Sequence, residues 1–390
     1  MKILVCGGGS GGHITPVLAV LEELYKKDPR LEVCFVCDKK FAPQAKTILE
    51  QSKVPITFKT INAGKLRRYH GVSFAKQIVD VPTVAKNVRD VFLVGAGYTQ
   101  SLALLRKFRP DVVFTKGGFV CLPMGLAASQ LRIPLVIHDS DTLPGLTNRI
   151  LAPRAKYIAT GAPLENYNYD KTKTSYVGIP ISSLFYTNTA NQRAELKKEV
   201  TVDPTRTLIF VTGGGLGAQR INDAVVKSAK KLIKEHCEII HISGVVNEKD
   251  VRKKLESTLS VDDLRYYHLE PFASNTDMAR YLKAADLVVS RSGATALTEI
   301  AALGKPTILI PNPQLAGGHQ LKNTQIYSDA GAAVVVDETE LEHRPDILTS
   351  ELLKLARNSQ ARRKLGDTMH KFAMPDAAAD VAALLVKAAG

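Results

Sequence analysis

Two glycine-rich turns are the features of this sequence that are best suited to chemistry. Residues 7–12 are Gly-Gly-Gly-Ser-Gly-Gly and residues 213–217 are Gly-Gly-Gly-Leu-Gly, and each turn lies between an apolar stretch and a helical pattern. Glycine lets the backbone approach an anion closely, and the helix that follows presents unpaired N–H groups and the positive end of its dipole. Shorter turns at residues 116–118 and 290–293 follow two further apolar stretches. Any one of these could be only a tight turn, but the four together favour a ligand that carries phosphate.

The elements around these turns alternate between short apolar strands and helices along the whole chain. This pattern is typical of parallel sheets with crossover helices. It restarts at residue 207, so we predict an α/β protein of two doubly wound, Rossmann-like units. In such sheets ligands bind beyond the carboxyl ends of the strands, and with two sheets the cleft between them is the natural site. We expect strands at residues 2–6, 32–37, 112–115, 134–138, 157–160, 207–212, 238–242, 287–290, 307–310 and 333–336.

The boundary between the two units is expected where the periodicity is interrupted. Gly178-Ile179-Pro180 and a polar stretch that ends at Gln192 mark this place. The first unit is then residues 1–182 and the second is residues 183–373. Residues 374–390 have an apolar helical pattern with no strand after it, and we expect this helix to pack back on the first unit.

The composition narrows the class of protein. The chain has 390 residues, of which 45% are apolar and 23% are charged, and this excludes disorder and a disulfide scaffold. Lysine and arginine number 52 against 38 acidic residues, so the net charge of +14 favours nucleic acid, an anionic membrane or phosphorylated substrates as partners.

Cys34 and Cys37 lie in an apolar run that indicates a buried strand rather than a zinc or redox site. Without a signal-peptide pattern or an apolar run of ~20 residues, we expect a protein of a reducing compartment that does not cross a membrane.

The first glycine turn allows other interpretations. Three of its glycines fit the dinucleotide pattern G-x-G-x-x-G and Asp38 stands where a ribose contact is expected, so an NAD-dependent oxidoreductase is an alternative. Against it, the second unit carries phosphate turns of its own, and His13 stands at the turn itself. Asp139-Ser140-Asp141 could hold a divalent metal against a sugar nucleotide, although so short a pattern also arises by chance. A P-loop is excluded because the sequence lacks its motif.

Several blocks of the sequence, in their order and spacing, resemble the MurG family of peptidoglycan glycosyltransferases. They are residues 7–16, 116–119, 137–139, 144–149, 177–180, 213–218, 286–299 and 319–320. This family moves N-acetylglucosamine from UDP onto undecaprenyl-linked lipid I to form lipid II. The resemblance implies a GT-B fold, with two Rossmann-like domains facing across a cleft. It also implies an inverting hexosyltransferase that uses UDP-GlcNAc as donor, needs no cofactor and needs no metal at Asp139 and Asp141.

The chemistry of such a transfer assigns roles to particular residues. Displacing UDP from an anomeric carbon needs a base for the acceptor hydroxyl and positive potential around the departing diphosphate. We expect His13 to be the base, because it is a titratable imidazole on a turn at the expected cleft. The alternative is a histidine that only bonds to the backbone at a helix start. The diphosphate would be held by N–H groups of residues 213–218 and of the helix that starts near Ala294.

The resemblance also implies contacts to the donor and the acceptor. Glu299, which we expect off the apolar stripe of its helix, would hold the ribose hydroxyls, and Ala273 would contact the uracil through its backbone. Gln320, with His319, would contact the donor sugar. The donor-binding residues are Ser10, Gly11, Gly12, Asp141, Gly215, Ala273, Ala294, Thr295, Ala296, Leu297, Thr298, Glu299, His319 and Gln320. The turns for the acceptor and its diphosphate contain Gly9, Gly117, Gly118 and Asn148.

Four positions depart from the family pattern. The chain has Asp141, Ser182, Gly215 and His319 where Asn, Arg, Ser and Gln are usual. An absent arginine removes a charge-assisted contact near the diphosphate, and we expect Arg220 or Lys116 to compensate. The departures leave two alternatives open. One is a related transferase for another UDP-sugar or lipid acceptor, and the other is a protein that binds UDP without transferring a sugar.

A basic segment with interleaved apolar residues lies between residues 64 and 109. It holds nine basic and two acidic residues, for a net charge of +7. Such a segment suits docking on an anionic leaflet, at ~1 kcal/mol per basic residue near the surface, although it could also be a solvated helix face over a core. No nucleic-acid-binding motif appears, so nucleic acid is not an expected partner. We expect peripheral attachment to the anionic inner surface of the cell membrane, on its cytoplasmic face, through a patch that includes Lys65, Arg67, Arg68, Phe74 and Phe92.

Overall fold

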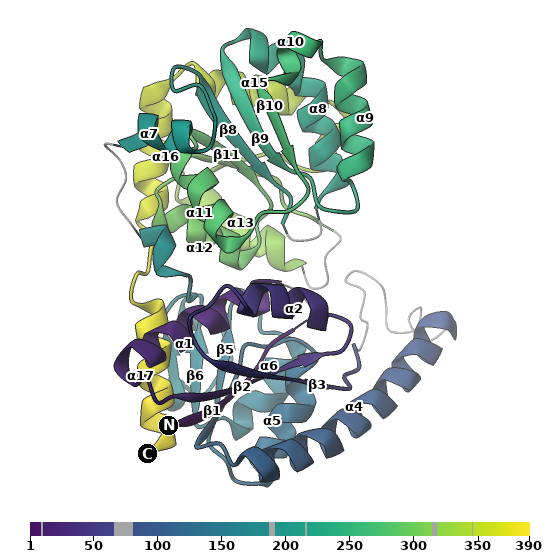
Figure 1. The fold of residues 1–390 in the computed structure, drawn as a ribbon, viewed down its shortest axis with the longest axis vertical. Helices are drawn as coiled ribbons and strands as arrows, with labels where there is room; N and C mark the ends of the chain where they lie inside the picture. The colour runs from purple at the N-terminus through teal and green to yellow at the C-terminus, as the bar shows by residue number, and fades with distance from the viewer. Residues whose placement is uncertain (9–10, 66–80, 187–191, 215–216, 314–317, 345) are drawn as a thin grey trace. The chain divides into compact units, whose positions relative to one another are not determined.

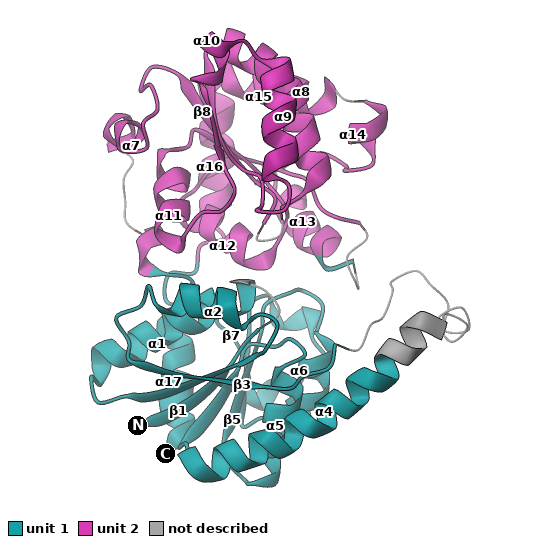
Figure 2. Ribbon diagram, turned by 45° about the vertical axis from the view of Figure 1, so that its right-hand side comes forward, with its two compact units in different colours: residues 1–182, 314–319, 374–390 teal, residues 183–313, 320–373 magenta. Residues whose placement is uncertain are grey.

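Parallel sheets form the centre of each of the two units into which the chain divides. The computed structural model describes residues 1–390 apart from 9–10, 66–80, 187–191, 215–216, 314–317 and 345 (Figure 1). The first unit comprises residues 1–182, 314–319 and 374–390, and the second comprises residues 183–313 and 320–373 (Figure 2). We describe each unit by itself.

The first unit contains a seven-stranded sheet in the order β3-β2-β1-β4-β5-β6-β7, and its strands pair in parallel. The central strands are nearly continuous apolar runs because helices cover both faces of the sheet. The strands are β1 (Lys2–Cys6), β2 (Glu32–Asp38), β3 (Ile56–Ile61), β4 (Val112–Thr115), β5 (Leu135–Asp139), β6 (Tyr157–Thr160) and β7 (Thr174–Tyr176).

The two faces of this sheet carry separate apolar cores. On one face α1 and α17 bury Leu21 and Leu385, and on the other α4, α5 and α6 bury Leu105, Met124 and Leu151. Pro16 lies in the first turn of α1, where the N–H that proline lacks would have no partner in the helix. The helices are α1 (Thr15–Lys27), α2 (Ala42–Leu49), α4 (Val81–Phe108), α5 (Cys121–Gln130), α6 (Leu146–Leu151) and α17 (Ala377–Ala389).

The second unit repeats this plan with a six-stranded parallel sheet in the order β10-β9-β8-β11-β12-β13. Its strands are β8 (Thr207–Thr212), β9 (Cys237–Ile242), β10 (Tyr267–Glu270), β11 (Leu287–Ser290), β12 (Thr307–Leu309) and β13 (Val334–Val335). Its helices are α7 (Arg193–Glu199), α8 (Gln219–Lys234), α9 (Glu248–Thr258), α10 (Val261–Leu264), α11 (Asn275–Ala284), α12 (Ala294–Ala302), α13 (His319–Asp329), α14 (Glu340–His343), α15 (Asp346–Ala356) and α16 (Ser359–His370).

The predicted α/β class with two doubly wound sheets is confirmed. Each of the ten expected strands is present, with ends within one residue of the prediction. The prediction missed β3, β7 and β10, which lie at the outer positions of their sheets. Outer strands need less apolar surface, and β3 accordingly alternates between half-buried and exposed residues over most of its length.

The sequence predicted that Cys34 and Cys37 lie in a buried strand and that the chain does not cross a membrane. Cys34 and Cys37 are buried in β2, and burial raises the pKa of their thiols to about 11 and about 12. This confirms a buried strand at these positions. Among the helices of the described residues, none combines the length and the apolar character that crossing a bilayer requires.

The C-terminal helix α17 belongs to the first unit although more than half of the chain separates it from that unit's sheet. Val381 and Leu385 are fully buried against α1 and the sheet. The Lys156 ammonium, next to the start of β6, donates a hydrogen bond of 3.0 Å to the Ala388 carbonyl at the end of the helix. The last residues of the chain therefore complete the core of its first unit.

We predict that Leu385→Ala lowers the free energy of unfolding by about 2–5 kcal/mol, because it opens a cavity in this core. Val386→Ala is the matched control: it lies on the same helix, 51% exposed, and should change the free energy by less than about 0.5 kcal/mol. Chemical denaturation measures both variants. Equal effects would contradict the packing described here.

Candidate functional site

The turns that follow β1, β4 and β5 lie at one edge of the first sheet. These strands are neighbours in the order β1-β4-β5 and run parallel, so their carboxyl ends lie side by side. A short 3₁₀ helix at Gly11–His13 leads from the first turn into α1. His13, residues 116–118 and residues 139–141 are thereby brought together, although they are far apart in the sequence.

His13 is held by the turn after β4. Its Nδ1 donates a hydrogen bond of 3.3 Å to the Lys116 carbonyl, and since a carbonyl only accepts, Nδ1 carries the proton and Nε2 is left to accept one. Gly118 has φ +83°, and a side chain on it would lie 3.2 Å from the Gly8 carbonyl and 3.6 Å from His13 Nε2. The positive φ and the nearby Gly8 carbonyl favour glycine at this position, and the imidazole lies next to it.

Burial and a neighbouring charge keep the imidazole neutral. Desolvation and, after it, the positive charge of Lys116 lower the pKa of His13 to about 4, while Asp141 acts in the opposite direction. The residue is therefore in its neutral form in the free protein at physiological pH. A neutral imidazole with an unprotonated Nε2 can accept a proton.

Lys116 and Asp139 are buried charged groups near His13. The Lys116 ammonium donates to the Ser140 hydroxyl, and burial lowers its pKa to about 8 against the opposing effect of Asp141 and Asp139. The Asp139 carboxylate accepts hydrogen bonds from Tyr169 Oη at 2.8 Å and from the Gly145 N–H at 3.2 Å. Burial raises the pKa of Asp139 to about 6.

Residues that the sequence predicts to contact the acceptor substrate also lie at the carboxyl edge of the first sheet. Asn148 on α6 is buried, donates a hydrogen bond of 3.0 Å to the His138 carbonyl, and lies against Gly117. Gly117 and Gly118 both have positive φ. The structure therefore brings Gly117, Gly118 and Asn148 together beside His13. Gly9 and Ser10 lie outside the described residues.

The second unit presents the start of α12 at the corresponding edge of its sheet. Residues 293–296, which follow β11, are half-buried, so the first N–H groups of the helix are not covered by a core. Ser292 precedes this turn and is tied to α13, because the Thr324 hydroxyl donates to its hydroxyl and Asn323 Nδ2 donates to its carbonyl at 3.3 Å. Such a helix start suits an anion.

Glu299 is buried although it does not belong to the predicted apolar stripe of α12. The residue is 8% exposed, and burial raises the pKa of its carboxyl to about 8. The sequence pattern assumed one buried face, but α12 also packs against α16, so from Leu297 onward the helix is buried on every side.

The glycine turn after β8 is held by a network that the sequence analysis missed. Gly217 has φ +74°, and a side chain on it would lie 2.3 Å from the Ser243 carbonyl. Asn222 Nδ2 donates to that carbonyl at 3.0 Å, and His241 lies between Asn222 Oδ1 at 3.0 Å and Tyr267 Oη at 2.7 Å. One sign of this network is present in the sequence: Asn222 is a polar residue on the apolar face of α8. Gly215 lies outside the described residues.

Gln320, Ala273 and Arg220 of the second unit were also predicted to be site residues. Gln320 Oε1 accepts a hydrogen bond of 2.8 Å from the Asn312 N–H, next to His319 at the start of α13. Ala273 is buried directly after β10. Arg220 forms ion pairs with Glu342 at 2.7 Å and with Glu338 at 3.6 Å. Its charge is thus already balanced in the free protein, and compensation for the missing arginine stays a prediction.

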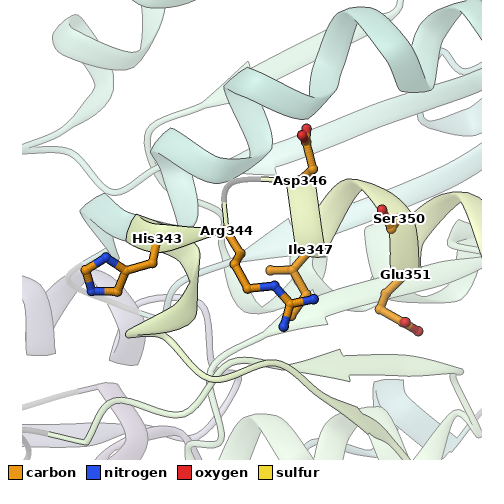
Figure 3. A pocket seen from close by; sticks show the side chains of 6 residues that line it. All are labelled: His343, Arg344, Asp346, Ile347, Ser350 and Glu351. Carbon is orange, nitrogen blue, oxygen red and sulfur yellow. The ribbon is translucent and has the colours of Figure 1, made fainter.

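A surface pocket in the second unit contains none of the expected residues. It lies over α14 and α15, and Figure 3 shows His343 pointing away from Ser350 and Glu351. Its side chains do not converge on one point. Within the described residues, no group of three or more His, Cys, Asp and Glu side chains is arranged to hold a metal ion.

Comparisons with known proteins agree with the two-unit division of the chain. Residues 3–160 match the glycosyltransferase family 28 N-terminal domain, and residues 208–381 match the C-terminal domain of the same family. Two relatives carry the name UDP-N-acetylglucosamine–N-acetylmuramyl-(pentapeptide) pyrophosphoryl-undecaprenol N-acetylglucosamine transferase. The protein from Halalkalibacterium halodurans is 34% identical over 87% of both chains, and that from Bacillus subtilis is 31% identical over 99% of both.

Solved structures share the fold. The crystal structure of Acinetobacter baumannii MurG has a TM-score of 0.69 at 22% identity and covers 99% of both chains. UDP-GlcNAc 2-epimerase from Neisseria meningitidis, bound to UDP-GlcNAc, has a TM-score of 0.67 at 14% identity and covers 99% of this chain and 100% of its own. The fold is GT-B. With both family 28 domains and relatives above 30% identity over nearly its full length, the chain belongs to the MurG family of glycosyltransferases.

Proposed function

We propose that this hexosyltransferase moves N-acetylglucosamine from UDP-GlcNAc to lipid I and so forms lipid II in peptidoglycan synthesis. The relatives carry this activity in their names. The observation in this chain that supports it best is the neutral His13, whose Nε2 is free to accept a proton at the carboxyl edge of the first sheet. In this proposal the first unit binds the acceptor and the second binds the UDP-sugar.

His13 acts as general base in the proposed transfer. Its Nε2 takes the proton of the acceptor hydroxyl while the hydroxyl oxygen forms a bond to the anomeric carbon of the donor. The bond from that carbon to the diphosphate oxygen breaks on the opposite side, its electron pair leaves with UDP, and the configuration inverts. General-base assistance of this kind contributes about 10²–10⁴-fold to the rate.

The second unit stabilises the departing diphosphate. Backbone N–H groups at the start of α12 and in the glycine turn after β8 supply positive potential without a metal ion. Glu299 accepts hydrogen bonds from the ribose hydroxyls, and the backbone of Ala273 contacts the uracil. His319 and Gln320 contact the donor sugar. The half-buried first turn of α12 supports this assignment.

His13→Ala and His13→Gln should lower the transfer rate by about 10²–10⁴-fold and leave UDP affinity unchanged, because UDP binds the second unit. The assay uses several UDP-sugars with a lipid-linked acceptor, and only UDP-GlcNAc should support fast transfer. His343→Ala, an exposed histidine of the second unit, is the control and should behave as the wild type. Full activity of the His13 variants would exclude His13 as the base, and preference for another UDP-sugar would contradict the proposed donor.

UDP affinity should depend on pH through Glu299. Burial raises the pKa of this carboxyl to about 8, so it is protonated near neutral pH in the free protein, whereas two ribose hydroxyls favour the carboxylate. Binding then releases a proton, and affinity should rise about fivefold from pH ~7 to ~8, about twofold more by pH ~9, and level off above that. Calorimetry measures UDP affinity against pH in the wild type and in Glu299→Gln. In the variant the effect of Glu299 is absent, and only the effect of the titration of UDP itself is left. The same pH dependence in both proteins would contradict the assignment.

We also propose that the first unit docks on the anionic cytoplasmic face of the cell membrane. The N-terminal half of α4 exposes Val88, Val91 and Phe92, the last of them 76% exposed. Lys65 is exposed as well, whereas Arg89 pairs with the buried Asp90 at 3.2 Å. Arg67, Arg68 and Phe74 lie outside the described residues. The apolar side chains of α4 supply insertion, and basic residues of this segment supply attraction to the lipid.

Phe92→Asp should reduce binding to vesicles of phosphatidylglycerol and phosphatidylcholine about tenfold, because an exposed aromatic ring that inserts into the leaflet is replaced by a charge that the leaflet repels. Val246→Asp is the control, since Val246 is 88% exposed on the second unit. Sedimentation of vesicles measures both, and wild-type binding should fall as salt rises. Equal loss in both variants, or equal binding of the wild type to neutral vesicles, would contradict the docking proposal.

A further inference from the structure

Lys116 is a buried lysine at the centre of the first unit's carboxyl edge. It is 1% exposed, and its ammonium donates to the Ser140 hydroxyl in the turn after β5. Removing an ammonium from water is costly, so a fully buried one at a ligand-binding edge indicates a role beyond packing. Part of the cost is offset by Asp139 and Asp141, whose charges act on Lys116 through space.

The same residue contacts the base of the proposed reaction. The Lys116 carbonyl accepts the Nδ1–H of His13 at 3.3 Å, while its side chain extends to the neighbouring turn. The charged groups that act on His13 are Lys116, from the turn after β4, and Asp141, from the turn after β5. His138 and Cys121 also interact electrostatically with Lys116, and both are buried.

We infer that Lys116 is a positioning residue for His13: its carbonyl holds the Nδ1–H of the imidazole, and its buried ammonium, bonded to Ser140, keeps a fixed positive charge in the turns beside the ring. The inference rests on the proposed function. In that function donor and acceptor each bring a diphosphate close to the reacting atoms, and these negative charges favour a protonated imidazole. The fixed positive charge counters that effect. Lys116 itself exchanges no proton, and the proton that His13 accepts is released to solvent after each turnover.

The direct test is the titration of His13 by ¹⁵N NMR in the full chain, with the signal assigned from His13→Gln. Without the ammonium, protonation of the ring becomes easier, so in Lys116→Met the pKa of His13 should rise from about 4 to about 5 or higher. Lys116→Arg keeps the charge and should restore the wild-type value. Lys116→Gln keeps a donor for Ser140 and replaces the Met variant if that variant does not fold.

Lys305→Met is the matched control. Lys305 is also buried, with its ammonium donating to the Lys283 carbonyl at 2.7 Å, but it lies in the second unit. This variant should leave the His13 titration unchanged. A His13 pKa that is the same in the wild type and in both neutral Lys116 variants would overturn the inference. The titration does not depend on turnover. Failure of this inference can therefore be told apart from failure of the proposed function, in which the wild-type protein would not transfer N-acetylglucosamine.

The pH profile of kcat separates positioning from a loss of structure. Between pH ~8 and ~4.5 the wild type should lose less than about twofold in rate, whereas Lys116→Met, with a His13 pKa of about 5, should lose about fourfold as His13 becomes protonated. A variant damaged only in its packing would be slower by the same factor at every pH. A pH-independent loss, with Lys116→Arg as slow as Lys116→Met, would contradict the inference.

Discussion

Parallel pairing of the strands is the constraint on which the rest of the structure depends. It places every carboxyl end of a sheet at the same edge, so turns that are distant in the sequence become neighbours. In the first unit it joins His13, Lys116 and Ser140 through β1, β4 and β5. In the second it places the glycine turn after β8 beside the start of α12, which follows β11. The chemistry proposed here needs no other long-range organisation within either unit.

Buried titratable groups at these two edges follow one principle. Desolvation moves Lys116, His13 and Glu299 toward their neutral forms, with pKa values of about 8, about 4 and about 8. A substrate that carries negative charge or hydroxyl donors changes this balance when it binds. The free protein therefore holds His13 unprotonated and Glu299 protonated near neutral pH, and in the proposed reaction substrate binding can change both states. Such perturbed groups gather at functional sites more often than elsewhere.

The central part of the fold could be predicted from the sequence, because inner strands are continuous apolar runs between turn signals. Outer strands such as β3 could not, since their half-exposed residues resemble loops. For the site, the glycine turns and His13 were identified from residue type and position alone. The burial of α12 on more than one face involves its packing against α16, which has no local signal in the sequence. Asn222 is visible as a polar residue on the apolar face of α8, but its partner after β9 is not. The ion pairs of Arg220 depend in the same way on Glu338 and Glu342, which lie more than a hundred residues further along the chain.

The central claim is that backbone N–H groups of the second unit hold the diphosphate of the donor. Amide hydrogen exchange measured by mass spectrometry, with and without UDP and with uridine as control, tests it most directly. The first turn of α12 is half-buried, so its N–H groups should exchange measurably in the free protein. UDP should slow exchange at residues 217–219 and 294–298, and uridine should not. Saturating UDP that leaves these segments unchanged, or that protects only the first unit, would contradict the claim.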